Sequence, residues 1–179
     1  MIYRQRKANR LKNYDYSSSG VYFVTICSKN RIEYFGTIVN KKMILNKIGG
    51  IVKECWEGIP KHFKDIILDK FVIMPNHVHG ILIINNVENR HACSLQHVCS
   101  LRRQNQLLPN VINSFKSASS KLIHQLQLNS FQWQKSFYDH IMRNEKSLNK
   151  IKEYVGNNPL NWDNDKENYN KINTFFKTT

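Results

Sequence analysis

The sequence predicts an α+β sandwich in which helices cover one face of a mostly antiparallel sheet. Residues 21–27 and 66–84 are rich in β-branched and aromatic side chains, which favour strands. Residues 46–58, 109–126 and 147–158 instead place apolar side chains at helical spacing. These segments follow one another as strand, helix, hairpin, helix, and a further helix, an order typical of this fold class.

The chain has 179 residues, a length that suits one compact domain, and 41% of them are apolar, enough for a core. We expect a basic arm over 1–19, a domain over 20–162 with a loop insertion at 85–108, and a polar tail over 163–179. No apolar run approaches the roughly 18 residues of a membrane span. The first ten residues lack the apolar stretch of a secretory signal. A cytoplasmic protein without membrane contact is expected.

The strand predictions differ in strength along the chain. Residues 21–27 form a buried strand, and 34–39 and 43–45 are shorter and weaker. Residues 66–74 and 77–84 are almost continuously apolar and are separated by Pro75-Asn76, which predicts a hairpin.

Each helix has a predicted boundary and buried face. Asn46 caps the first, which runs toward Gly58. The last covers 147–158 and stops at Pro159, with Leu148, Ile151 and Val155 buried. The middle helix begins near Pro109, and its predicted apolar positions are Val111, Ile112, Phe115, Ala118, Leu122 and Leu126.

Charge favours a polyanionic partner. Lys and Arg number 27 against 13 Asp and Glu, a formal net charge of +14. Such an excess on one small domain raises the expectation of nucleic acid, although an anionic surface of another kind would also be attracted. The side chains predicted to contact DNA phosphates are Lys116, Lys121, Arg143, Lys150 and, in the arm, Arg4, Arg6, Lys7 and Arg10.

His77 and His79 are the strongest candidates for metal ligands. Residues i and i+2 of a strand project from the same face, so both imidazoles point the same way while Val78 points to the other. Two neutral imidazoles with one or two oxygen ligands suit Mg²⁺, Mn²⁺ or Zn²⁺. The alternative is that both histidines simply face solvent. The strand is otherwise apolar, however, which makes two unpartnered histidines costly there.

A second group of ligand-type residues is explained more simply. His91, Cys93, His97 and Cys99 lie in an imperfect six-residue tandem duplication over 91–102, and copying one His-x-Cys unit produces the pattern. The spacing lacks the CxxC pairs of common structural zinc sites, so we expect a tolerated loop.

Four segments resemble a known family. Residues 71–80, FVIMPNHVHG, closely resemble the HUH motif of single-tyrosine transposases, in which two histidines flank one hydrophobic residue. Residues 20–25 (GVYFVT), 133–144 (WQKSFYDHIMRN) and 154–160 (YVGNNPL) resemble other blocks of that family, in the same order. The match is best with its REP-associated tyrosine transposase branch and spans most of 20–162. The duplication at 91–102 lengthens a connection that varies in the family.

The resemblance implies a ferredoxin-like (RRM-like) sandwich with the histidine pair on a central strand. It implies Tyr154 as the nucleophile and Asn158 as a third ligand, with His77 and His79, of Mg²⁺ or Mn²⁺. It also implies a homodimer that cleaves and rejoins single-stranded DNA beside imperfect hairpins through a 5′-phosphotyrosine intermediate.

The residues themselves agree with that implication. Tyr154 and Asn158 are four positions apart and therefore neighbours on one helix edge, with Lys150 one turn earlier as a cation that could help ionise the phenol. Tyr138, near His140 in sequence, is the rival nucleophile. Trp133 and Tyr138 could stack on unpaired bases, but core packing is the more common role of large aromatics.

A second function class remains open on sequence alone. A ferredoxin-like scaffold can also serve as a non-catalytic nucleic-acid-binding module. The discriminating observation is whether His77, His79 and Tyr154 converge in space.

Overall fold

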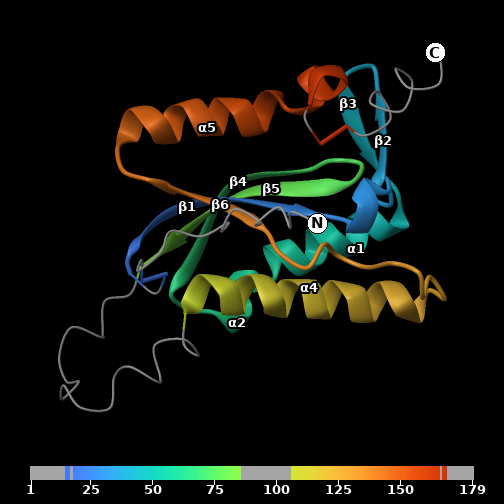
Figure 1. Cartoon of the computed structure of the whole chain (residues 1–179), viewed down its shortest axis with the longest axis horizontal. Helices are drawn as coiled ribbons and strands as arrows, with labels where there is room; N and C mark the ends of the chain where they lie inside the picture. The colour runs from blue at the N-terminus through green and yellow to red at the C-terminus, as the bar shows by residue number, and fades with distance from the viewer. Residues whose placement is uncertain (1–14, 17, 86–105, 166, 169–179) are drawn as a thin grey trace, which may run out of the picture.

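The computed structural model of the chain describes residues 15–16, 18–85, 106–165 and 167–168. Its centre is a four-stranded sheet of β1 (Gly20–Cys27), β4 (Ile66–Ile73), β5 (His77–Ile84) and β6 (Tyr138–Met142), in the order β4-β5-β1-β6 (Figure 1). Every neighbouring pair in it is antiparallel. The predicted hairpin is confirmed as β4 and β5, with β5 in a central position.

Two helices connect these strands and complete the topology. α1 (Lys47–Glu57) lies between β1 and β4 in the chain, and α4 (Leu107–Gln125) lies between β5 and β6. The order βαββαβ with this arrangement of strands is the ferredoxin-like fold, so the predicted α+β class is confirmed. The weaker predicted strands form a separate two-stranded sheet, β2 (Gly36–Val39) with β3 (Lys42–Leu45), and a short helix α2 (Ile59–His62) follows α1.

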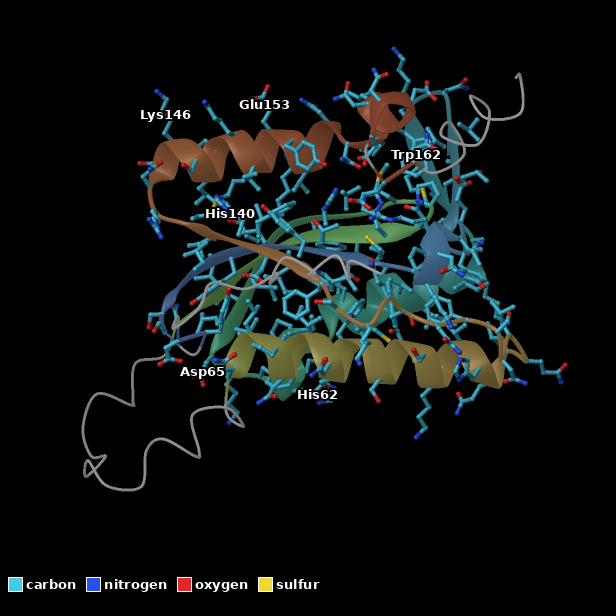
Figure 2. All side chains as sticks on the ribbon, in the orientation of Figure 1. His62, Asp65, His140, Lys146, Glu153 and Trp162 are labelled. Carbon is cyan, nitrogen blue, oxygen red and sulfur yellow. The ribbon has the colours of Figure 1, made fainter. Side chains whose placement is uncertain are left out.

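The prediction that helices lie on one face of the sheet is wrong for α5 (Glu145–Asn157). α1 and α4 cover one face, and α5 covers the other (Figure 1). Val155 of α5 packs with Phe23, Ile81 and Met142, apart from the larger core under α1 and α4. The reason is that β1 and β5 have apolar side chains on both faces, and both faces must then be covered. The outer side of α5 is polar, and Figure 2 shows Lys146 and Glu153 pointing away from the sheet.

The larger core depends on a close approach between Trp56 of α1 and Gly80 of β5. The Trp56 side chain is fully buried. A Cβ atom on Gly80 would lie 2.1 Å from Cζ2 of that indole, so only glycine leaves room for the ring. Gly80 therefore lets α1 pack directly on a central strand.

The buried face of α4 differs from the predicted one in its second half. Ser119 and Ile123 are buried there, whereas Leu122 is 40% exposed, and Ala118 and Leu126 are exposed as well. The burial of Ser119 has a partner to explain it, because its hydroxyl accepts a hydrogen bond of 3.0 Å from Nε1 of Trp133. A partnered serine can be buried at little cost.

The predicted Asn46 cap of α1 is confirmed, and α5 has a cap that was not predicted. The Asn46 side chain accepts a hydrogen bond from the Gly49 backbone N–H at the start of α1. α5 begins two residues earlier than predicted because the Asn144 side chain caps it, accepting from the Ser147 N–H. α5 ends before Pro159, and a short 3-10 helix η2 (Pro159–Asn164) follows. No described helix has the length and apolar character needed to cross a membrane.

Candidate active site

The site is built on the end of β5 that pairs with the end of β1. His77 lies opposite Cys27 and His79 opposite Thr25 in the strand register. The imidazole centroids are 4.4 Å apart, and both rings are buried on the sheet face that α5 covers. The two histidines therefore point to the same side, as the i, i+2 spacing predicts.

Hydrogen bonds orient the His77 ring. The amide nitrogen of Asn76 donates to the carbonyl oxygens of Arg31 and Glu167, so its Oδ1 faces His77 at 2.8 Å from Nδ1. Because Oδ1 can only accept, His77 Nδ1 carries the proton and its Nε2 keeps a lone pair. A ring held in this way by its second nitrogen is typical of metal-binding histidines.

Thr25 orients the His79 ring in the same way. Its Oγ1 lies 2.9 Å from Nδ1 of His79. In the tautomer that leaves Nε2 available to a ligand, Nδ1 donates this hydrogen bond to the threonine. His79 thus presents Nε2 toward Tyr154 of α5.

Burial keeps both imidazoles neutral. It lowers the pKa of His77 to about 3, with a further lowering by the Arg31 guanidinium. The pKa of His79 is also well below its ordinary value, because of burial and the neighbouring His77, against an opposing effect of Asp165. Only a neutral imidazole binds a metal, so the pair is in its ligating form at neutral pH.

Oxygen atoms complete the group. A carboxylate oxygen of Asp165 and one nitrogen of each histidine all lie within 4.8 Å of one another, so these three residues could hold a metal ion. The Asn158 amide nitrogen donates to Oδ2 of Asp165 at 2.9 Å. Asn158, the third ligand implied by the resemblance, thus lies beside Asp165. Asp165 is not among the candidate ligands predicted from the sequence. Asp165 sits in the expected polar tail, and no spacing relates it to the histidines.

Two of the candidate ligand atoms lack a hydrogen-bond partner, which supports a metal site. Among the described residues, His77 Nε2 and Asn158 Oδ1 are buried side-chain atoms without a hydrogen-bond partner. Leaving such atoms unsatisfied is costly, and each has a lone pair that a cation would use. Two imidazole nitrogens with an amide and a carboxylate oxygen form a donor set that fits a divalent ion.

Tyr154 reaches the same site from α5. Its hydroxyl oxygen lies 3.2 Å from Nε2 of His79, and its ring is 5.2 Å from the imidazole. The side chain remains 43% exposed, so a ligand can reach it from solvent. Burial and the Asp165 carboxylate raise the pKa of Tyr154, while a hydrogen bond from Asn158 lowers it. The predicted residues His77, His79, Tyr154 and Asn158 therefore converge.

The predicted DNA contacts are placed less uniformly. Lys150 and Arg143 are exposed, on α5 and after β6 respectively. Lys116 and Lys121 are on α4, which covers the sheet face opposite the histidine pair (Figure 1). Lys116 donates to the carbonyl oxygens of Gln134 and Ser136, so its ammonium group has a structural contact.

The two aromatic candidates differ. Trp133 packs against the larger core through Phe35, Phe115 and Phe131, which agrees with the more common role of large aromatics. Tyr138 is 54% exposed on the edge strand β6. Of the two candidate nucleophiles, Tyr154 is the one with a described contact to the histidine pair. The arm cations and the 91–102 duplication, with its histidines and cysteines, lie outside the described residues.

Comparison with known proteins identifies relatives of this chain. No family model matches the chain. A Haemophilus influenzae protein named "Uncharacterized protein" is 42% identical over 164 residues, covering 89% of this chain and 91% of that protein. The chain belongs to the same family as this protein. A second one, named "Putative REP-associated tyrosine transposase", is 24% identical over 153 residues, 84% of this chain and 77% of that protein.

That second relative confirms the resemblance to the REP-associated tyrosine transposases. A solved REP-associated tyrosine transposase bound to a REP hairpin is 16% identical, with a TM-score of 0.48 over 84% of this chain and 72% of that one. A Deinococcus radiodurans R1 structure described as a "putative transposase" is 17% identical, with a TM-score of 0.44 over 83% and 95%. The strand order described above defines the fold.

Proposed function

We propose that this protein is a metal-dependent tyrosine transposase that cleaves and rejoins single-stranded DNA beside hairpins through a 5′-phosphotyrosine intermediate. The observation behind the proposal is the 3.2 Å contact between the Tyr154 hydroxyl and Nε2 of His79, beside His77 and Asp165. His77, His79 and Tyr154 therefore lie together, as an enzyme requires and a non-catalytic binding module does not. The relative named as a REP-associated tyrosine transposase supports the same class.

His77, His79, Asn158 and Asp165 would hold the ion, which we expect to be Mg²⁺ or Mn²⁺. A bound divalent ion supplies Lewis acidity and neutralises phosphate charge. The residues of the chain fix the ligand set through their own partners: Asn76 and Thr25 orient the two rings, and the Asn158–Asp165 hydrogen bond holds the two oxygen ligands together.

In the cleavage step the Tyr154 oxygen attacks phosphorus. The new O–P bond forms as the bond from phosphorus to the 3′ oxygen breaks. The phenol loses a proton and the leaving 3′ oxygen gains one, so the step is balanced. Because burial raises the Tyr154 pKa, the phenol is protonated at neutral pH and needs activation. Lys150, one turn earlier on α5, is a cation placed to assist.

Rejoining is the reverse of the same step. A 3′-hydroxyl from a second strand attacks the phosphotyrosine, the O–P bond to Tyr154 breaks, and the phenol recovers its proton. The phosphodiester energy is kept in the covalent link, so no nucleotide cofactor is required. Arg143 and Lys150 are the exposed cations that we propose for phosphate contact on this side of the sheet. A homodimer is part of the proposal.

A covalent-adduct assay tests the function directly. Purified full-length protein is incubated with hairpin oligonucleotides whose single-stranded flanks are randomised, so that the cleavage sequence need not be known. With Mn²⁺, a 3′-end label should move to a protein-linked band in a denaturing gel, while a 5′-end label should appear in a shortened strand. EDTA should prevent both.

Two variants make the result specific. Tyr154→Phe should abolish the adduct, and Tyr138→Phe, which removes the rival hydroxyl, should leave it intact. An adduct that survives Tyr154→Phe would assign the nucleophile elsewhere. DNA binding without an adduct in any metal would favour the non-catalytic nucleic-acid-binding module.

A further inference from the structure

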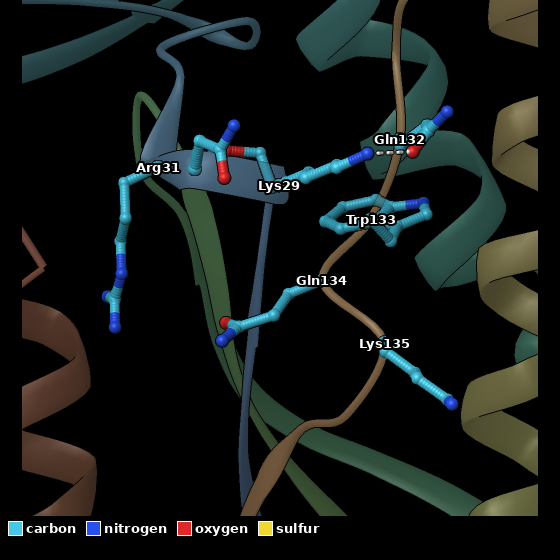
Figure 3. Close-up of a pocket in the computed structure, with 8 residues that line it drawn as sticks. Lys29, Arg31, Gln132, Trp133, Gln134 and Lys135 are labelled. Atoms are coloured by element: carbon cyan, nitrogen blue, oxygen red, sulfur yellow. Dashed lines mark hydrogen bonds between the residues drawn. The ribbon is translucent and has the colours of Figure 1, made fainter. Parts of the chain in front are cut away.

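A polar pocket lies beside the histidine pair, at the end of β1. It has a volume of about 370 Å³ and is formed by η1 (Lys29–Arg31), the preceding Ser28 and residues 132–135 (Figure 3). This volume falls in the range of small-ligand sites, about 300–1,000 Å³. The mechanism described above uses none of the lining side chains.

The pocket walls are held firmly. The Lys29 N–H donates to the Gln132 carbonyl and the Gln134 N–H to the Cys27 carbonyl, each at 2.8 Å. The Lys116 ammonium also donates to the Gln134 carbonyl, which helps to hold residues 132–135 in place. Asn30 and Arg31 both have left-handed backbones, with φ of 56° and 57°, a conformation that non-glycine residues adopt only when surrounding contacts impose it.

The lining chemistry suits a nucleotide. Three of the lining residues are cationic and, among the described residues that form the pocket, none is acidic. Lys29 is positioned at the rim by a 2.7 Å hydrogen bond to Oε1 of Gln132, as Figure 3 shows. Arg31 is paired with Glu167, which leaves Lys29 and Lys135 as the cations for a phosphate.

Base recognition has its own groups in the pocket. Asn30, Gln132 and Gln134 have side-chain amides, which both donate and accept and can match the edge of a base. Trp133 also lines the pocket, and its indole is fixed there by packing against Phe115 and by the hydrogen bond to Ser119. Cations that contact phosphate and amides that can match a base edge are together suited to an unpaired nucleotide.

Asn76 connects the pocket to the histidine site. Its backbone carbonyl accepts from the Ser28 N–H at 2.8 Å, and its amide nitrogen donates to the Arg31 carbonyl at 3.1 Å. The same side chain orients His77 through Oδ1. One residue therefore touches both η1 and His77, so the pocket lies next to the proposed metal site.

We propose that this pocket binds one unpaired nucleotide of the DNA strand adjacent to the cleavage position, with Gln134 reading the base and Lys135 contacting its phosphate. This inference rests on the proposed function for the identity of the strand. It adds a specificity site at the end of β1, next to Asn76 and the histidine pair.

The test measures binding without cleavage. In the Tyr154→Phe background with Mg²⁺, the full-length protein selects from hairpin oligonucleotides with randomised flanks, and the bound fraction is sequenced. Gln134→Ala with Lys135→Ala is compared with Gln125→Ala with Lys64→Ala, which removes the same exposed residue types elsewhere. Circular dichroism melting checks that both pairs remain folded.

We expect the parent protein to enrich particular bases at one flank position, and the pocket variant to lose that enrichment. Its affinity for the selected flanked hairpin should fall roughly tenfold, the size of a lost base contact, with affinity for a flankless hairpin unchanged. The control pair should behave as the parent. Retained enrichment, or equal losses for flanked and flankless hairpins, would overturn the proposal.

The outcome separates this inference from the proposed function. Enrichment that depends on the pocket but without an adduct from the wild-type protein would support the pocket and overturn the transposase proposal. An adduct without pocket-dependent enrichment would support the transposase proposal and overturn the pocket assignment. Absence of any enrichment by the parent protein would also overturn the pocket assignment.

Discussion

The hydroxyl oxygen of Tyr154 lies 3.2 Å from Nε2 of His79, so the nucleophile proposed on α5 contacts a ligand proposed on β5. The Nε2 atom has one lone pair in the ligating tautomer. It cannot accept a hydrogen bond from the tyrosine and coordinate an ion at the same time. A metal ion and the Tyr154 hydroxyl therefore compete for His79.

Tyr154→Phe should consequently bind Mn²⁺ more tightly than the wild-type protein. Removing the competing hydrogen bond, worth about 0.5–1.5 kcal/mol, corresponds to roughly a 2- to 10-fold gain in affinity. Isothermal titration calorimetry without DNA would measure it. Tyr138→Phe is the matched control and should leave the affinity unchanged. Weaker binding by Tyr154→Phe would mean that the hydroxyl supports the ion.

Asp165→Asn should weaken Mn²⁺ binding. The change removes the carboxylate of the group while preserving its size. Loss of even an outer partner of a ligand costs on the order of 10- to 100-fold in metal affinity, so we expect a loss of at least that size. Asp163→Asn, two residues before Asp165 and exposed, removes an equal charge outside the site. Equal effects of the two changes would show that Asp165 acts only through general charge.

The stability of the metal-free protein should fall as the pH is lowered from 6.5. The unfolded chain protonates His77 near pH 6.5, whereas burial lowers the folded pKa to about 3. Between these values the unfolded state binds one more proton, so the free energy of unfolding decreases with falling pH by about 1.4 kcal/mol per unit. Urea unfolding in EDTA at pH 7.5, 6.5 and 5.5 would measure the slope.

His77→Gln should make that slope shallower by about one proton's contribution. His62→Gln, at an exposed position in α2, is the control and should keep the wild-type slope. If His77→Gln left the slope unchanged, His77 would titrate normally in the folded protein.

Gly80→Ala should destabilise the fold, because its Cβ would lie 2.1 Å from the Trp56 ring. Overpacking of this kind costs typically 1–3 kcal/mol, so we expect a loss of about that size in thermal or urea unfolding. Gly50→Ala in α1 is the counterpart, since a Cβ there meets nothing within 4 Å. It should stabilise the protein by up to about 1 kcal/mol. Tolerance of Gly80→Ala would show that Trp56 can move aside.

Several elements could be predicted because their signals are local. The hairpin around Pro75-Asn76 follows from two apolar strands with a short turn, and the α1 cap follows from the hydrogen-bonding chemistry of Asn46. The shared direction of His77 and His79 follows from strand geometry alone. None of these features depends on a distant part of the chain.

The errors concern contacts between distant segments. The amphipathic pattern of α5 shows that one side is buried, but not which face of the sheet buries it. In α4, the buried position of Ser119 depends on the indole N–H of Trp133, fourteen residues away and in another segment. Such choices depend on partners that a helical repeat does not specify.

The sequence by itself determined the fold class, the direction of the histidine pair and the basic character of the protein, because strand period, helix period and charge are properties of neighbouring residues. Only the tertiary structure decided that α5 covers the histidine face, that Tyr154 touches His79, and that Asp165 joins the group. The physical reason is that burial and hydrogen bonding arise when remote segments meet, and that meeting also makes the histidines neutral.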